Sequence, residues 1–128
     1  MSSIDPAVER LLTSDPAVAH LATCRDGRPH LAPLWFHYDD GTVEVVTSGR
    51  KLEDLRENPF VSLSVEKSER GRAEWMVSLR GTATVVEDDD AFREANARIN
   101  RKYGVEEDAW ADNTLVRIDV GSASARTY

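Results

Sequence analysis

Residues 47–51, Thr-Ser-Gly-Arg-Lys, gather groups that bind anions. They begin a stretch that Asn58-Pro59 ends, so the pattern predicts a short helix within residues 47–58. A helix N-terminus carries partial positive charge and unsatisfied N–H groups, so Arg50 and Lys51 stand where acidic side chains are normally favoured. Two hydroxyls, from Thr47 and Ser48, add further donors. Together these groups predict a phosphate site at the start of the helix.

A second interpretation of the two cations stays open at this point. Arg50 precedes Glu53 and Asp54 by three and four residues, and Lys51 precedes Asp54 by three. Side chains at these spacings form ion pairs on a helix surface, each worth about 0.2–0.5 kcal/mol. Under this interpretation the segment is ordinary solvated surface, without a ligand.

Aromatic residues form the next candidate site. They cluster in Trp35-Phe36-His37-Tyr38 and again in Trp75-Met76. Such clusters can form core and a half-exposed strand face, or a flat apolar slot for an aromatic ligand. His20 and the other two histidines, His30 and His37, have no acidic or cysteine partner at ligand spacing, so no metal site is predicted. No serine lies in a nucleophile elbow and no acid pair lies in apolar surroundings, so no catalytic residue is assigned.

Composition restricts the class of protein. The 128 residues suffice for a single domain, 1–128, and a net charge of -7 without a basic stripe disfavours nucleic-acid binding. No apolar run approaches the roughly 20 residues of a membrane span. The N-terminal residues lack the features of a signal peptide, and one cysteine cannot form an internal disulfide, so we expect a cytoplasmic protein without membrane association.

The pattern of elements is mainly β, with α+β character. Asp5 and Pro6 begin a predicted helix, Asp26-Gly27 predicts a hairpin turn, Pro33 indicates an edge strand or a bulge, and Gly81 indicates a bulge. About six antiparallel strands with short flanking helices favour a small barrel. The predicted helices are 5–13, 47–58 and 88–104, and the predicted strands are 18–24, 29–38, 42–48, 60–66, 73–88, 115–120 and, less regularly, 123–128.

Four segments carry a resemblance to a known family: HLATCRDGRPHLAPLWF (20–36), VTSGRKLEDLRENPFVSLSVE (46–66), LRGTATVVED (79–88) and RKYG (101–104). Through them most of the chain resembles the pyridoxamine 5'-phosphate oxidase-like superfamily, the flavin- and deazaflavin-binding split β-barrels. The resemblance implies a six-stranded antiparallel split barrel that forms a homodimer, with two cofactor sites at the subunit interface. The chain resembles the small members that bind the deazaflavin F-420 at least as much as those that bind FMN.

The resemblance also implies roles for particular residues. Thr47, Ser48, Arg50 and Lys51 match the turn that binds the cofactor phosphate, and the strand Pro33-Leu34-Trp35-Phe36 matches the one that lies along the tricyclic ring. We further expect the Trp75-Met76 segment to reach the ring pocket across the dimer interface, because an aromatic and an adaptable side chain adjoin there.

The expected function is that of an oxidoreductase with F-420 or FMN as cofactor. It would transfer a hydride between the bound cofactor and a small organic acceptor, with no protein acid or base required. The C-terminal residues with which pyridoxal phosphate-forming enzymes hold cofactor and substrate have no obvious equivalent, which counts against that activity. The alternative is a flavin-, haem- or tetrapyrrole-binding protein without turnover, with His20, His30 or His37 as an axial ligand.

Overall fold

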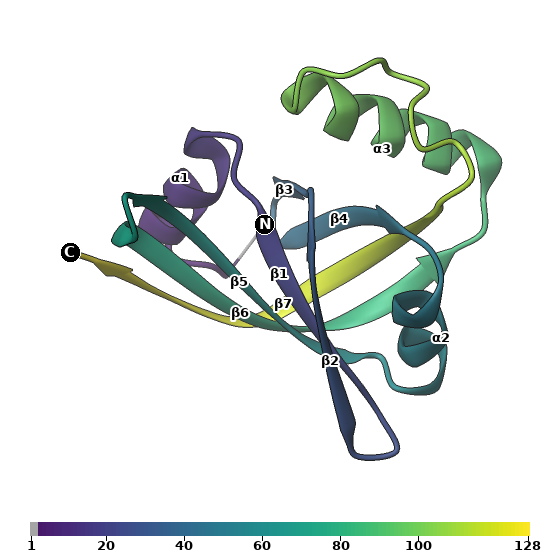
Figure 1. Cartoon of the computed structure of the whole chain (residues 1–128), viewed down its shortest axis with the longest axis horizontal. Helices are drawn as coiled ribbons and strands as arrows, with labels where there is room; N and C mark the ends of the chain where they lie inside the picture. Colours follow the sequence, from purple (N-terminus) through teal and green to yellow (C-terminus); the bar gives the residue numbers. More distant parts are fainter. Residues whose placement is uncertain (1–2) are drawn as a thin grey trace.

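The computed structural model describes residues 3–128 and shows a single curved antiparallel sheet with three helices (Figure 1). The strands follow one another across the sheet in the order β2-β1-β5-β6-β7-β4-β3. In chain order the elements are α1 (Pro6–Ser14), β1 (Ala19–Arg25), β2 (Arg28–Leu34), β3 (His37–Asp39), β4 (Thr42–Thr47), α2 (Arg50–Glu57), β5 (Phe60–Glu69), β6 (Arg72–Val86), α3 (Asp89–Lys102) and β7 (Thr114–Thr127).

The predicted six-stranded barrel is corrected to a seven-stranded sheet that does not close. The segment 29–38, expected as one strand, breaks at Trp35-Phe36 into β2 and β3. β2 pairs only with β1 and β3 only with β4, so these two residues cross from one edge of the sheet to the other. Pro33 lies on the edge strand β2, as its missing N–H group predicted.

The bulge expected at Gly81 is confirmed. The pairing of β6 with β7 shifts register between Arg80 and Gly81, where Gly121 is the extra residue on β7. A Cβ atom on Gly81 would lie 2.4 Å from the carbonyl oxygen of Asp119, so the two strands approach too closely there for a side chain. The expected strands 115–120 and 123–128 are therefore one strand that continues through the bulge.

The core lies between the sheet and the helices. Alternate residues of β5 and β6, such as Leu63 and Val77, are buried in the same hydrophobic cluster as Leu12 of α1. The helices begin as predicted: Asp5 accepts a hydrogen bond from the Ala7 amide at 2.8 Å. In Figure 1 α1 and α3 lie on one side of the sheet, and no helix covers the opposite side of β5 and β6. None of the helices in the described part of the chain is long and apolar enough to cross a membrane.

Candidate functional site

The crossover segment Trp35-Phe36 is held in place by the end of α3. Lys102 Nζ donates to the carbonyl oxygen of Phe36 at 2.9 Å and lies 3.8 Å from the centre of the Phe36 ring. The Tyr103 hydroxyl donates to the carbonyl oxygen of Ala17 at 2.5 Å and accepts from the Phe36 amide at 3.4 Å. The Tyr103 ring stacks on Trp35, with centroids 4.7 Å apart. Both backbone polar groups of Phe36 are thus satisfied where the ladder of the sheet is interrupted.

The Lys102 ammonium has no counter-charge among the groups that hold the crossover segment. Among residues 3–128 no carboxylate oxygen lies within 4 Å of its Nζ, and burial lowers the pKa of Lys102 to about 8. Burial also raises the pKa of Tyr103, so the phenol keeps its proton at neutral pH. The cation is stabilised by the Phe36 ring and a carbonyl oxygen rather than by a counter-charge.

A cavity of about 180 Å³ opens beside the crossover. Trp110 faces Trp35 edge-on, with ring centroids 6.4 Å apart and planes at 82°. Because Val46 also lines the cavity, the crossover adjoins the end of β4, one residue before Thr47. The lining residues are Leu34, Trp35, Val46, Ile99, Asn100, Trp110 and Asn113.

The start of α2 has no side-chain cap. Gly49 is the N-cap, with a left-handed φ of 68°, and neither of the preceding hydroxyls accepts a hydrogen bond from the helix. The Thr47 side chain is buried, whereas Ser48 and Arg50 are exposed. In the part of the chain that the structure describes, Lys51 forms no ion pair within 4 Å. The first N–H groups of α2 and the Lys51 ammonium thus remain available to an anion.

The position of Arg50 in the first turn of α2 is explained in part by an ion pair within the helix. Its Nε lies 3.8 Å from Oδ2 of Asp54, one of the pairs that the helical spacing allowed. Asp54 is fully buried, and its carboxylate also accepts from Thr23 Oγ1 at 2.9 Å and lies 3.3 Å from Arg25 Nε. A buried carboxylate needs such partners. Arg50 therefore helps to neutralise Asp54, and the same cluster ties α2 to β1.

The other predicted ligand residues lie in different environments. Pro33 is exposed at the end of β2 and Leu34 is half-buried, whereas Phe36 is in the core. Trp75, with 7% of its surface exposed, packs in the core and borders a separate cleft of about 320 Å³ with His20. One subunit thus brings Leu34 and Trp35 next to β4 but not to Trp75, whose contact with the ring across a dimer interface stays a prediction.

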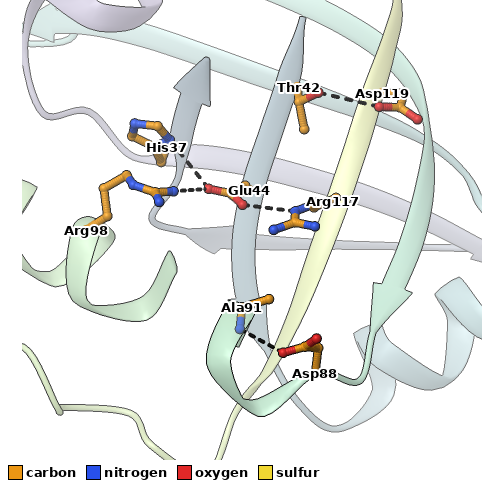
Figure 2. A network of polar contacts seen from close by, with 8 residues as sticks. All are labelled: His37, Thr42, Glu44, Asp88, Ala91, Arg98, Arg117 and Asp119. Carbon is orange, nitrogen blue, oxygen red and sulfur yellow. Dashed lines mark hydrogen bonds and ion pairs between the residues drawn. The ribbon is translucent and has the colours of Figure 1, made fainter. Parts of the chain in front are cut away.

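A polar cluster braces α3 against the sheet (Figure 2). Glu44 of β4 accepts from Arg98 Nη1 of α3 at 2.6 Å and from Arg117 Nε of β7 at 3.1 Å. His37 Nδ1 lies 3.6 Å from Glu44. Burial, and then the Arg98 charge, lower the pKa of His37, so its ring is neutral at pH 7. By fixing α3, the cluster also fixes the Lys102 and Tyr103 contacts that hold the crossover.

Sequence reasoning missed the residues that shape the cavity from α3 and the following loop. Lys102 and Tyr103 belong to the RKYG segment, but nothing local connects them with Phe36, which is more than sixty residues away. Asn100 and Trp110 carried no signal at all. No group of three or more histidine, cysteine or acidic residues suited to a metal occurs in residues 3–128.

Solved structures similar to this one include proteins whose descriptions name a cofactor. A FAD-binding protein from Mesorhizobium loti is 25% identical, with 98% of this chain and 96% of that chain covered and a TM-score of 0.78. An F420 reductase is 27% identical, with 90% and 94% covered and a TM-score of 0.72. HutZ, a haem storage protein from Vibrio cholerae, is 20% identical, with 99% and 95% covered and a TM-score of 0.77; at this identity the likeness concerns the fold alone.

No curated protein sequence matches the chain. The family profile described as pyridoxamine 5'-phosphate oxidase, however, matches residues 5–127, which is nearly the whole length. The fold, the solved relatives and this profile agree, and the chain belongs to the pyridoxamine 5'-phosphate oxidase family.

Proposed function

We propose that this protein is an oxidoreductase that binds F-420 or FMN and transfers a hydride between the cofactor and a small organic acceptor. One observation supports this most directly. The cavity beside Trp35 is also lined by Val46, and the chain continues from Val46 into the uncapped turn at residues 47–51. An aromatic slot and an anion-binding helix start are therefore neighbours, which is the arrangement that a phosphorylated tricyclic ring requires.

The likeness to relatives with flavin and F420 in their descriptions supports the same class of cofactor. A deazaflavin supplies hydride transfer only, whereas FMN also supplies one-electron and oxygen chemistry. The chain's own contribution is orientation: Tyr103 and Lys102 hold the crossover rigid, and the α2 start would bind the phosphate. We propose that two such sites form at a homodimer interface, where Trp75 of the partner would complete each ring pocket.

Lys51→Ala tests the phosphate part of this proposal. A charge-assisted contact of about 1.5–3 kcal/mol corresponds to a loss of roughly 10- to 150-fold in FMN or F-420 affinity. Riboflavin, which lacks the phosphate, should lose far less. Lys51 is the better probe because Arg50 also contacts the buried Asp54, so its removal would disturb the fold.

Arg56→Ala is the matched control, because Arg56 is an exposed cation in the last turn of the same helix and pairs with Glu87. It should leave both affinities unchanged. Equal losses for FMN and riboflavin in Lys51→Ala would contradict a phosphate contact. Tight haem binding with a Soret band, in place of flavin or deazaflavin binding, would favour the storage alternative.

A further inference from the structure

A polar cleft of about 600 Å³ lies beside α3, on the part of the sheet formed by β3, β4 and β7. Val43 and Val45 of β4 are buried in the core. The residues that alternate with them, Thr42 and Glu44, therefore point to the opposite face, where they line the cleft. Apart from Thr42, every described residue that lines the cleft has an ionisable side chain. The proposed function makes no use of this group of charges.

The strand register arranges the charged side chains in two rows. His37 of β3 and Arg117 of β7 both lie opposite Glu44. Asp39 of β3 lies opposite Thr42, two residues before Glu44 on β4. Residues that lie opposite one another share a face of the sheet, and a step of two residues along a strand is roughly 7 Å. The cleft therefore has a basic end, at the row through Glu44, and an acidic end, at the row through Thr42.

At the basic end two guanidinium groups share one carboxylate. Glu44 accepts from Arg98 Nη1 at 2.6 Å and from Arg117 Nε at 3.1 Å, and Figure 2 shows the two side chains reaching it from opposite sides. Burial, and then the Arg98 charge, lower the pKa of His37, so this ring adds no charge at pH 7. Two positive charges against one negative charge leave this end positive. Both arginine side chains stay partly exposed, at 38% and 44%, and a guanidinium has five N–H donors, so each can also bind a second carboxylate.

The acidic end lies at the turn between β3 and β4. Asp39 and Asp40 are exposed there, and Asp39 forms no ion pair with any of residues 3–128. A free anion is repelled by these acids and by the net charge of -7 on the chain. A free cation is repelled in turn by the guanidinium groups at the basic end. A small molecule that carries one charge of each sign is attracted at both ends.

We propose that this cleft binds a zwitterion, a small α-amino acid, with its carboxylate at Arg98 and Arg117 and its ammonium at Asp39. The two rows are roughly 7 Å apart, which suits a ligand whose two charges are only a few bonds apart and each form a hydrogen bond of about 2.8 Å. The cleft shares no described lining residue with the cavity beside Trp35. The inference is therefore independent of the proposed function.

Glycine, acetate and methylammonium are matched probes, because the two ions are the two halves of glycine. Each is titrated at pH 7 and constant ionic strength into ¹⁵N-labelled protein, and the backbone amide signals are followed by NMR. We expect glycine to shift the signals of residues 37–44 and of Arg117 with saturation. Acetate and methylammonium should each bind at least about tenfold more weakly, because each gains at one end and is repelled at the other. Either half binding as tightly as glycine would overturn the proposal.

Asp39→Asn removes a charge at the acidic end and should weaken glycine binding at least about fivefold. Asp108→Asn is the matched control, because Asp108 is an exposed acid in the loop after α3 and does not line the cleft; it should leave the affinity unchanged. Arg117→Gln should weaken glycine binding as well but not methylammonium binding, and Glu44 keeps its bond from Arg98 in this variant. The absence of saturable shifts, or an unchanged glycine affinity in Asp39→Asn or Arg117→Gln, would overturn the proposal.

Discussion

At the scale of single residues, Lys102 is a half-buried charge without a counter-charge among residues 3–128. The protein has many carboxylates, yet within residues 3–128 the Lys102 ammonium contacts a carbonyl oxygen and aromatic rings instead. Burial disfavours the charged form of Lys102 and lowers its pKa from 10.5 to about 8. The same contact fixes the backbone at Phe36, so stability and site geometry depend on one side chain.

The Lys102 pKa predicts a particular pH dependence of stability. Between about pH 8 and pH 10.5 the unfolded chain keeps the Lys102 proton and the folded chain releases it, so the unfolded state binds more protons. The free energy of unfolding of the wild type should therefore rise with pH in this window relative to that of Lys102→Met. Urea unfolding of both proteins at pH 7, 8, 9 and 10 measures the difference. Below pH 8 the difference should be constant.

Lys67→Met is the control for this experiment, because Lys67 is an exposed lysine that pairs with Asp15. Its difference from the wild type should not rise between pH 8 and pH 10. A flat curve for Lys102→Met as well would mean that the Lys102 ammonium is not desolvated in the folded protein, and that its contact with Phe36 is loose.

The residues found from the sequence are those with short-range partners. Helical spacing was enough to foresee the Arg50–Asp54 pair, and the Thr-Ser-Gly-Arg-Lys pattern was enough to suggest an anion site. Helical spacing could not show that Asp54 is buried, because its other partners, Thr23 and Arg25, come from β1. Lys102, Asn100 and Trp110 act across tertiary contacts, and no local pattern encodes those.

At the scale of elements, the bulge between β6 and β7 bends the sheet at one close approach. Gly81→Ala would place a Cβ atom 2.4 Å from the Asp119 carbonyl oxygen and 2.9 Å from Ile118 Cγ2. A backbone oxygen cannot move away without loss of strand pairing, so we expect a loss of about 1–3 kcal/mol in the free energy of unfolding. Chemical denaturation of the variant measures it.

Gly121→Ala is the matched control in the same bulge. Its Cβ atom would meet only the Arg80 carbonyl oxygen, at 3.6 Å, which is ordinary contact. This variant should lose well under about 1 kcal/mol. Equal losses in the two variants would show that the strands are not held at the spacing described.

Element boundaries were predictable where a local signal marks them. Asp5 caps its helix and Gly81 marks a bulge, as patterns alone indicated. The break at Trp35-Phe36 was missed because both residues favour strands. What ends β2 there is the change of partner from β1 to β4, and the bonds from Lys102 and Tyr103 replace the ladder. For the same reason the sheet has seven strands and does not close, where a small six-stranded barrel was expected.

At the scale of the whole molecule, one face of the sheet has no cover in a single subunit. The outward side chains of β1, β5 and β6 on this face include the small Ala22, Ser62 and Ser78 beside the larger Arg80. A groove of about 530 Å³ crosses it, and two large apolar side chains, Leu31 and Phe60, are 64% and 71% exposed nearby. An uncovered sheet face with large exposed apolar side chains beside its groove suits contact with a second copy of the chain.

The expected homodimer should therefore depend on Phe60. The wild type should have about twice the 14.3 kDa mass of the chain by light scattering at micromolar concentration, in enough salt to screen the net charge of -7 on each subunit. Phe60→Asp places a charge in the contact and should give a monomer, because an unpaired carboxylate is costly to bury. Val105→Asp, which adds the same charge at an exposed apolar residue in the loop after α3, should remain a dimer. A Phe60→Asp dimer would exclude this face as the interface. A Phe60→Asp monomer that binds FMN or F-420 as tightly as the wild type would show that one subunit holds the complete site, and that Trp75 of the partner contributes nothing to it.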